Sequence, residues 1–358
     1  MIIIYKEMNS AKTISKENSE DFNTNISCLI NLEKIKKYWA RNKCLSENFE
    51  LLDIIGYGSE SVVCSCSEKT IQKKIIASKI IFNKRKNKNY LNELEIFSKL
   101  KHKNIVTYFG FCNLIKDESW CLLMGYGKFG NLNNFRRNTI KMKCLPESMI
   151  CYIAYQILDG LFYCHKNKIA HMDLKPNNII VDKYLNFKII DFSISINYKD
   201  KNYSEVIKLP IIGTSLYMPL EVLFKQKIKY KELHKVDLYS LGVILYNLAF
   251  GTFPYNITSD DQEKYSKIGE KIYINDIGKE IIDNQNGFSK HFLDFLNKLL
   301  QKDIYERINI YEAKEHYWIK GSKILLDEKE KTYGMNDFAD YLLTNSIKDF
   351  NDYIGKNP

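Results

Sequence analysis

The chain has 358 residues, of which 45% are hydrophobic and 27% charged, with 16 Gly and 6 Pro. This composition supplies a large apolar core and excludes a collagen, a mucin-like stalk and a wholly disordered chain. The 53 basic and 43 acidic side chains give a net charge of +10. No apolar run reaches the roughly eighteen residues that a membrane-spanning helix needs.

The nine cysteines are scattered, and no two of them form a Cys-x-x-Cys pair. No secretory signal follows Met1, so the pattern predicts reduced thiols in an intracellular protein, cytoplasmic or also nuclear. Residues 84–88 form a basic run, for which a solvated loop is favoured over a nuclear signal or a nucleic-acid contact. We expect no nucleic-acid partner, no membrane association and no structural zinc.

Residues 1–48 are predicted to form an N-terminal extension. About the first thirty residues are polar and show no hydrophobic period, so we expect them to be mobile. Leu32, Ile35 and Trp39 recur at spacings of three and four, which predicts one short amphipathic helix. This helix is expected to pack or dock and not to form a site.

From residue 49 the pattern changes to short strands, predicted over residues 51–55, 61–66, 73–81, 106–112 and 120–126. One helix is predicted between the third and fourth strands, over residues 87–101. Beyond Gly130 the apolar period lengthens, and buried helices are predicted around residues 150–161, 237–250 and 291–300. This order predicts an α+β fold, with a small β-rich part followed by a larger α-helical part.

The segment that carries chemistry reads His-Met-Asp-Leu-Lys-Pro-Asn-Asn over residues 171–178, and Asp-Phe-Ser follows at 191–193. Together the two segments resemble the catalytic loop and the metal-binding loop of the eukaryotic protein kinase family. Four further motifs appear in the family's order: a glycine-rich loop, a lysine-bearing strand, the end of an activation segment and a buried anchoring helix, at residues 55–63, 77–79, 213–221 and 237–243.

The resemblance covers residues 49 to about 320 and implies a two-lobed protein kinase-like fold. It places the N-lobe at 49–126 and the C-lobe at 131–320, and it leaves a C-terminal helical tail at 321–358. It also implies a serine/threonine kinase of no recognisable subfamily, which transfers the γ-phosphate of ATP, with Mg²⁺, to protein hydroxyls.

The resemblance implies roles for five residues at the reacting end. Asp173 would orient the substrate hydroxyl and accept its proton, and Lys175 would offset charge on the γ-phosphate. Asn178 and Asp191 would hold magnesium, which prefers hard oxygen ligands. Lys175 and Thr214, which occupies the family's Gly-Thr position, are typical of serine/threonine kinases.

For the nucleotide, the resemblance implies that Lys79 grips the α and β phosphates and is positioned by Glu93. Glu95 is the competing partner, but it lies about 160° away around the helix; the alternative for Lys79 and Glu93 is two ordinary surface charges. The glycine-rich loop, the adenine walls and the hinge imply contacts from Ile55, Gly56, Gly58, Ser59, Val63, Ala77, Met124, Gly125, Tyr126 and Ile180. An ordinary turn or core residue is the alternative for each.

Several residues depart from the family's motifs. Met172 replaces the arginine of His-Arg-Asp, so a phosphate on the activation segment, at Ser195, Tyr198, Tyr203, Ser204 or Thr214, would lack its usual cation. Activity is therefore predicted not to depend strongly on phosphorylation of this segment. Ser193 replaces the glycine of Asp-Phe-Gly. Glycine can adopt backbone angles that cost a residue with a Cβ atom about 1 kcal/mol or more, so Ser193 is expected to restrict the conformations of this loop.

Other departures are milder. Ser61 replaces the third glycine of the glycine-rich loop, and the interval between Lys79 and Glu93 is short. Pro219 precedes Leu220 and Glu221 where the family has Ala-Pro-Glu, which shifts the proline and keeps the glutamate. The resemblance implies that Glu221 pairs with Arg307 in a structural role.

The competing hypothesis is a pseudokinase scaffold that binds nucleotide or partner proteins with little transfer. Met172 and Ser193 keep it open, whereas the four expected catalytic and metal-binding side chains favour an enzyme: Lys79, Asp173, Asn178 and Asp191. A tyrosine kinase or a kinase of non-protein substrates is a third alternative. Expected partners are a protein bearing Ser or Thr, and a regulatory or docking partner of the terminal extensions. No EF-hand loop occurs, so calcium control through one is not expected.

Overall fold

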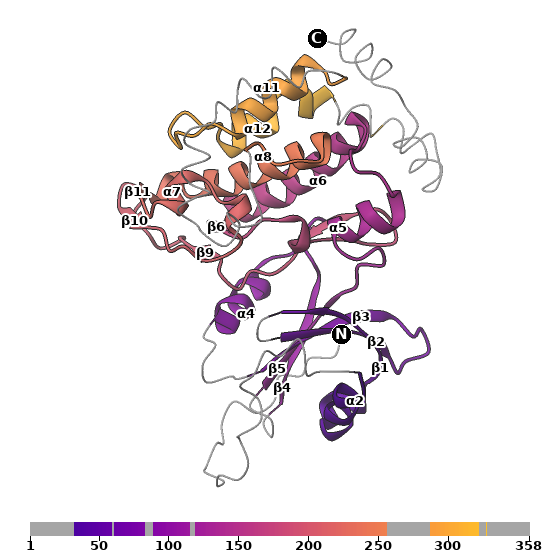
Figure 1. Cartoon of the computed structure of the whole chain (residues 1–358). Coiled ribbons are helices and arrows are strands. Elements are labelled where there is room, and N and C mark those ends of the chain that lie inside the picture. The colour runs from indigo at the N-terminus through magenta and orange to yellow at the C-terminus, as the bar shows by residue number, and fades with distance from the viewer. Residues whose placement is uncertain are drawn as a thin grey trace. The chain divides into compact units, whose positions relative to one another are not determined.

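The computed structural model describes residues 32–58, 61–82, 89–114, 119–255, 287–321 and 327. The chain forms two compact units, Met1–Leu91 with Val106–Gly127 and Asn92–Ile105 with Lys128–Pro358 (Figure 1). The first unit holds the main sheet and the second holds most helices, which confirms the predicted α+β fold. The first 31 residues, the basic run at 84–88 and the tail beyond 321, apart from residue 327, lie outside the described residues.

The first unit is built on a five-stranded antiparallel sheet in the order β1-β2-β3-β5-β4. The strands are β1 (Phe49–Tyr57), β2 (Ser61–Glu68), β3 (Ile75–Ile81), β4 (Tyr108–Leu114) and β5 (Ser119–Gly125). All five predicted strands are confirmed. The pairing of β1 with β2 shifts register twice, between Leu51 and Asp53 and between Ile54 and Gly56, so the side chains of β1 do not alternate strictly.

Two short helices cover one face of this sheet, α2 (Leu32–Arg41) and α3 (Lys43–Ser46). Ile35 and Trp39 of α2 are only 2% and 4% exposed. They share a core with sheet residues that point to one side by strand alternation: Val62, Cys64, Cys66, Ile76, Ile80, Cys112, Cys121 and Leu123. The predicted amphipathic helix is therefore confirmed as a packing element, and α2 with α3 is called the α2–α3 cap below.

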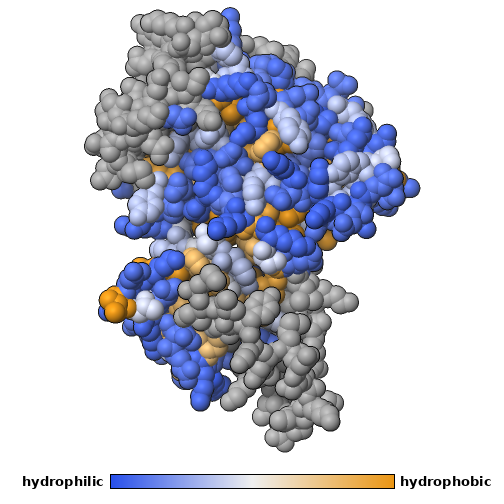
Figure 2. Space-filling model, turned by 180° about the vertical axis from the view of Figure 1, so that it is seen from behind, coloured by the Kyte–Doolittle hydropathy of each residue, from blue (hydrophilic) through white to orange (hydrophobic). Residues whose placement is uncertain are grey.

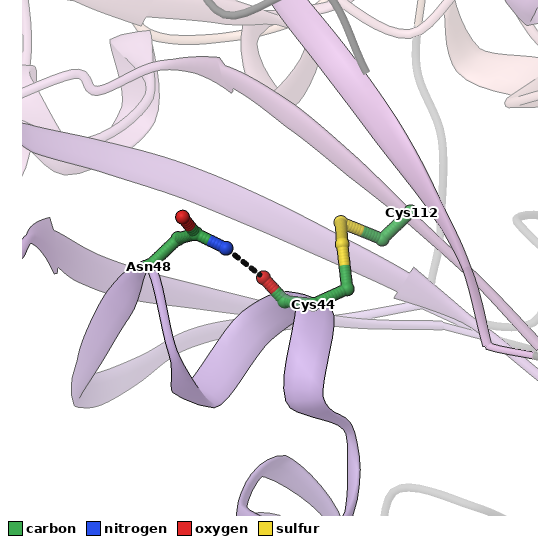
Figure 3. Close-up of a disulfide and its surroundings, with 3 residues drawn as sticks. All are labelled: Cys44, Asn48 and Cys112. Atoms are coloured by element: carbon green, nitrogen blue, oxygen red, sulfur yellow. Dashed lines mark hydrogen bonds between the residues drawn. A yellow bond between two sulfur atoms is a disulfide. The ribbon is translucent and has the colours of Figure 1, made fainter. Parts of the chain in front are cut away.

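A disulfide fastens the α2–α3 cap to the sheet, joining Cys44 of α3 to Cys112 of β4 across 68 residues of sequence (Figure 3). The expectation of reduced thiols is wrong for this pair. Packing of the cap brings the two Cα atoms to 6.5 Å, within the range of disulfides. The Asn48 side chain donates to the Cys44 carbonyl at 3.0 Å and satisfies an end of α3. The other six described cysteines form no disulfide.

Cys44→Ser should lower the free energy of unfolding by about 2–4 kcal/mol, because the cross-link closes a long loop and restricts the unfolded chain. Thermal unfolding with and without a thiol reductant measures the effect, and the matched control is Cys144→Ser at an exposed thiol outside the disulfide. Reduction of the denatured wild-type protein should release two additional thiols. An unchanged thiol count after reduction would refute the cross-link.

The second unit contains most of α4 (Asn89–Lys99), the buried α8 (His234–Phe250) and further helices. These helices are α5 (Leu132–Asn134), α6 (Glu147–Lys166), α7 (Leu220–Leu223), α11 (Lys290–Leu299) and α12 (Ile310–Glu315). Nearly every residue of α8 is buried, as expected for a helix that is apolar on all sides. The predicted helices at 87–101, 150–161, 237–250 and 291–300 are confirmed.

Three pairs of short strands among the described residues flank the loops of the second unit that carry the motifs. They are β6 (Ile169–Ala170) with β9 (Ile196–Asn197), β7 (Ile179–Val181) with β8 (Phe187–Ile189), and β10 (Val206–Lys208) with β11 (Lys227–Lys229). The loop that carries residues 171–178 lies between β6 and β7, and Asp191 follows β8. The β6–β9 and β7–β8 pairs therefore hold the two motif segments.

The exposed large hydrophobic side chains of the described residues are spread over many elements, from Leu52 on β1 to Tyr311 on α12. On the face drawn in Figure 2, hydrophobic residues form small areas among hydrophilic ones. Within the described ranges, no helix is both long and apolar enough to cross a membrane.

Candidate active site

The Asp173 carboxylate is surrounded by hydrogen-bond donors. Its Oδ2 accepts from Lys175 Nζ at 2.7 Å and from Asn178 Nδ2 at 3.0 Å, and its Oδ1 accepts from the Thr214 backbone N–H at 3.1 Å. The same Lys175 ammonium also donates to Thr214 Oγ1 at 2.7 Å. Four residues that the sequence predicts for the site, Asp173, Lys175, Asn178 and Thr214, are thus in direct contact.

The close approach of residues 213 and 214 to Asp173 requires a glycine. Gly213 has φ +115°, a backbone conformation that other residues rarely adopt. A Cβ atom at this position would lie 2.8 Å from Asp173 Oδ1. Glycine is therefore the residue that lets Thr214 reach both Asp173 and Lys175.

The loop that carries Asp173 is anchored from below by Asp237 of α8. This carboxylate accepts from the backbone N–H groups of His171 and Met172 and lies against His165 Nε2, each at 2.8 Å. Burial alone would raise the pKa of Asp237, but the hydrogen bond and charge of His165 hold it below the ordinary value. Met172 takes a left-handed backbone conformation, φ 69°, and the bond from its N–H to Asp237 helps to stabilise that turn.

His234 lies beside this anchor and remains uncharged. The His165 and His234 rings are 5.6 Å apart, and His234 Nε2 is buried without a hydrogen-bond partner among the described residues. Burial, followed by the charges of His165 and Lys235, lowers the pKa of His234 to about 3. A backbone hydrogen bond at Lys231 and the charge of Asp237 act in the opposite direction and do not offset it.

Acid should therefore destabilise the protein through His234. Its contribution to stability is complete above pH 6.5 and is lost as the pH falls toward about 3, because only the unfolded side chain binds a proton in that interval. One proton corresponds to about 1.4 kcal/mol per pH unit. Urea unfolding at pH 7, 6 and 5 should give a shallower pH slope for His234→Gln than for wild type. Parallel slopes would contradict this assignment.

The predicted metal ligands flank the β7–β8 hairpin. Asn178 immediately precedes β7, Asp191 follows β8, and the Ile190 N–H donates to the Asn178 carbonyl at 2.9 Å. The Asn178 amide nitrogen donates both to the Asp173 carbonyl and to its carboxylate, which turns the amide oxygen to the other side. A carboxylate and an amide oxygen are a donor set that fits magnesium.

The backbone strain expected at Ser193 occurs elsewhere. Asp191 has φ 65°, whereas Ser193 is not among the described residues with positive φ. A short polar side chain tolerates the left-handed region better than most, so the aspartate adopts the special conformation itself. In this conformation the replacement of glycine by Ser193 carries no such cost.

The activation segment between residues 192 and 221 is fixed at both ends, by packing of Phe192 and by an ion pair of Glu221. The buried Phe192 ring packs edge-on against Phe97 and His171, at centroid distances of 5.4 and 4.9 Å. The Glu221 carboxylate receives two bonds from the Arg307 guanidinium, at 2.6 and 3.2 Å, and both side chains are 1% exposed or less. The expected pair of Glu221 and Arg307 is confirmed.

The nucleotide candidates of the first unit share one face of its sheet. Val63 is paired with Lys79, and Ala77 with Met124, so these four side chains project to the side opposite the α2–α3 cap. The hairpin between β1 and β2 closes with a bond from the Gly58 N–H to the Ser61 carbonyl at 2.8 Å, and Gly56 is paired with Val63. Ser59 lies outside the described residues.

The remaining candidates are distributed over both units. Ile55 on β1 is 44% exposed, and Tyr126 is half-buried after β5. The Gly125 N–H donates to the Thr107 carbonyl, so this amide is already used. Ile180 is half-buried on β7 of the second unit and is bridged to Asn131.

Burial distinguishes the two candidate glutamates of α4. Glu93 is 1% exposed, whereas the Glu95 carboxylate is at the surface and pairs with Lys99 at 2.6 Å. A surface pair one helical turn apart is ordinary helix stabilisation. Burial therefore favours Glu93, and its pairing with Lys79 of the other unit stays a prediction.

Sequence reasoning missed Asn92 and misjudged Ser195. Asn92 of α4 donates to backbone carbonyls of residues 192–195, and it belongs to none of the motifs. Ser195 and Tyr198 were expected as candidate phosphorylation sites, but they are 5% and 4% exposed, whereas Tyr203 and Ser204 are exposed. No periodicity or spacing in the sequence signals the contacts of Asn92.

Comparison with known proteins agrees with this geometry. A family model described as the protein kinase domain matches residues 49–319. The chain is 26% identical over 314 residues to serine/threonine-protein kinase pakD of Dictyostelium discoideum, covering 82% of this chain and 18% of that protein. It is 31% identical over 289 residues to calcium-dependent protein kinase 4 of Plasmodium falciparum, with coverages of 78% and 51%.

A third relative is serine/threonine-protein kinase ULK3 of Xenopus laevis, 28% identical over 285 residues, with coverages of 76% of this chain and 55% of that protein. The chain thus spans between about a fifth and about half of the length of these curated relatives.

Proposed function

The chain belongs to the protein kinase family, and from this premise we propose that it is a serine/threonine protein kinase that uses ATP and Mg²⁺. The observation that carries the proposal is the Asp173 carboxylate, held by Lys175, Asn178 and the Thr214 N–H on a loop anchored by Asp237. Phosphoryl transfer requires mainly positioning and charge stabilisation, and this arrangement supplies both.

Asp173 orients the substrate hydroxyl and accepts its proton as the phosphoryl group is transferred. Its Oδ1 has one donor where Oδ2 has two, so Oδ1 is the oxygen with a lone pair left for that proton. Lys175, fixed between Asp173 and Thr214, presents its ammonium group to the γ-phosphate. The Lys175–Thr214 contact supports a serine/threonine specificity.

Asn178 and Asp191 would hold the magnesium ions through their side-chain oxygens. When bound, the metal offsets the negative charge of the phosphates during transfer. The left-handed turn at Asp191 and the bond between Ile190 and Asn178 support this role, because they fix the two ligands on one hairpin. Lys79 grips the α and β phosphates and is positioned by Glu93.

The adenine is proposed to pack between apolar walls formed by Val63, Ala77 and Ile180, next to Met124 and the backbone at Gly125 and Tyr126. Ile55, Gly56, Gly58 and Ser59 form the glycine-rich loop over the phosphates. The shared sheet face of Val63, Ala77, Lys79 and Met124 supports this arrangement. Nothing on the described residues favours the pseudokinase scaffold, and we do not propose it.

We further propose an extension at 1–48, a kinase domain at 49–320 and a tail at 321–358, with protein substrates and a docking or regulatory partner of the extensions. No nucleic-acid or membrane partner is proposed. We also propose an intracellular location, cytoplasmic or nuclear.

The test is transfer of labelled γ-phosphate from ATP by purified protein to a mixed panel of serine, threonine and tyrosine peptides. We expect magnesium-dependent label on serine and threonine, and none with Asp191→Asn. Label on tyrosine alone would overturn the specificity. Nucleotide binding without any transfer would overturn the proposed activity and make the scaffold the better account.

A further inference from the structure

Ser195 joins three parts of the second unit. Its hydroxyl donates to the His171 carbonyl at 2.9 Å, and its N–H donates to the Phe192 carbonyl at 3.2 Å. Its own carbonyl accepts from Asn92 Nδ2 at 2.8 Å. The residue is 5% exposed, so these bonds are shielded from water. Helix α4, the segment after Asp191 and the loop that carries Asp173 therefore meet at one side chain and its backbone.

Asn92 supplies the contact from α4. Its amide nitrogen also lies 3.4 Å from the carbonyl oxygens of Phe192 and Ser193, in addition to the shorter bond to Ser195. Three acceptors thus surround one donor group. A side chain of the same shape that carried an acceptor in place of this donor would face three carbonyl oxygens and repel them.

Aromatic packing acts at the same place. Phe97 lies five residues after Asn92, and its ring contacts Phe192, which in turn contacts His171. Asp191 directly precedes Phe192. The contacts that Phe97 makes with the Phe192 ring, and Asn92 with the carbonyls of residues 192–195, therefore also determine where Asp191 lies. The proposed metal ligand is positioned by α4 through both contacts.

These contacts hold the activation segment without a phosphate on it. Met172 offers no cation for such a phosphate. The segment is instead held by neutral bonds: pairing of Ala170 with Ile196, the Tyr198 N–H donating to the Lys168 carbonyl at 2.8 Å, and the junction at Ser195. The activation segment of the unmodified chain is therefore already held in place by neutral hydrogen bonds, without an ion pair between a phosphate and a cation.

We propose that Asn92 and Ser195 are positioning residues that hold the Asp191 segment in place without phosphate on the activation segment. The inference rests on the proposed kinase function and deepens it by naming what positions the metal-binding loop. Asn92 and Ser195 act through the backbone of residues 192–195 and do not touch the reacting groups.

Hydrogen exchange of backbone amides tests the positioning directly and needs neither metal nor activity. The variants are Asn92→Asp, which reverses donor and acceptor in the same shape, Asn92→Leu, which removes the donor, and Ser195→Ala. Exchange in peptides covering residues 191–198 should be at least tenfold faster in Asn92→Asp than in wild type, with smaller increases in the other two. The control is Ser98→Ala, which removes a surface hydroxyl bond to the Glu95 carbonyl on the same helix and should leave this exchange unchanged.

Kinetics supply the second readout. Asn92→Asp should lower kcat about 10- to 100-fold and raise the magnesium concentration needed for half-maximal rate several-fold, while the KM for the peptide stays within twofold. A loss of stability alone would not separate these quantities. Wild-type protein treated with phosphatase should keep its activity within twofold.

Each result decides a separate question. Unchanged exchange over residues 191–198 in Asn92→Asp overturns the positioning role, whatever the activity. Loss of wild-type turnover after phosphatase treatment overturns the independence from phosphate. If exchange rises as expected but wild-type protein transfers no phosphate, the junction is supported and it is the proposed kinase function that fails.

Discussion

Asp173→Asn should lower kcat by about two to four orders of magnitude, the range that a positioned general base contributes. The carboxylate accepts from three donors, on Lys175, Asn178 and Thr214. An amide of the same shape turns one N–H group toward these donors, so at least one of the bonds is lost. It also cannot take the substrate proton. ATP binding should remain close to wild type, because Asp173 is proposed to contact the substrate hydroxyl.

The matched control for this substitution is Asp182→Asn. The Asp182 carboxylate likewise accepts three bonds, from the Tyr184 N–H and from the backbone and side chain of Asn186, in the turn between β7 and β8. Its replacement should change stability and leave kcat near wild type. Steady-state phosphate transfer and nucleotide titration measure both variants. If Asp173→Asn retained more than a tenth of the wild-type kcat, its role as base would be wrong.

Arg307→Met should destabilise the protein by about 3–5 kcal/mol, which is the usual cost of leaving one member of a buried ion pair alone. Arg307 makes two bonds to Glu221, and it also donates to the carbonyls of Lys235 and Gln301, both at 3.0 Å. Its guanidinium lies 4.9 Å from the Tyr239 ring centroid. Removal leaves the Glu221 charge and two carbonyls without these donors, and the melting temperature should fall by on the order of 10 °C.

Two further variants make this expectation specific. Arg307→Lys should recover little, because a lysine cannot reproduce the planar fork that serves Glu221 and the carbonyls together. Lys298→Met, which breaks an exposed pair with Asp294 one helical turn away, should cost less than about 1 kcal/mol. Adding Glu221→Gln to Arg307→Met should restore part of the lost stability, since the unpaired charge is removed. Independent, additive losses would argue against a coupled pair.

The sequence predicted the candidate site best where the functional residues lie in one continuous segment. Asp173, Lys175 and Asn178 lie within six residues, the resemblance to a family named all three, and the structure brings them into contact around one carboxylate. The resemblance likewise named Val63, Ala77 and Lys79, and the register of β2 with β3 in the structure puts them on a common face. Glu221 and Arg307 are 86 residues apart, and only the resemblance to a family connected them.

Contacts made by single polar or sulfur atoms at long range were not predictable. Cys44 and Cys112 carry no spacing signal, and their meeting depends on how the α2–α3 cap packs. Asn92 reaches Ser195 across 103 residues through one amide group. The left-handed conformation of Asp191 also gives no sign in the sequence, because side-chain identity limits backbone dihedrals only weakly at an aspartate.

The α2–α3 cap changes where the folding unit begins. The family match starts at residue 49, but the sheet face beneath the cap is lined by Val62, Cys64, Ile80 and Cys121, all fully buried. A fragment that started at Phe49 would expose this face to water as one contiguous apolar area, which is typical of aggregation-prone proteins. The shortest soluble fragment that holds this sheet should therefore begin no later than Leu32, because α2 and α3 share the core of the first unit although they precede the family match.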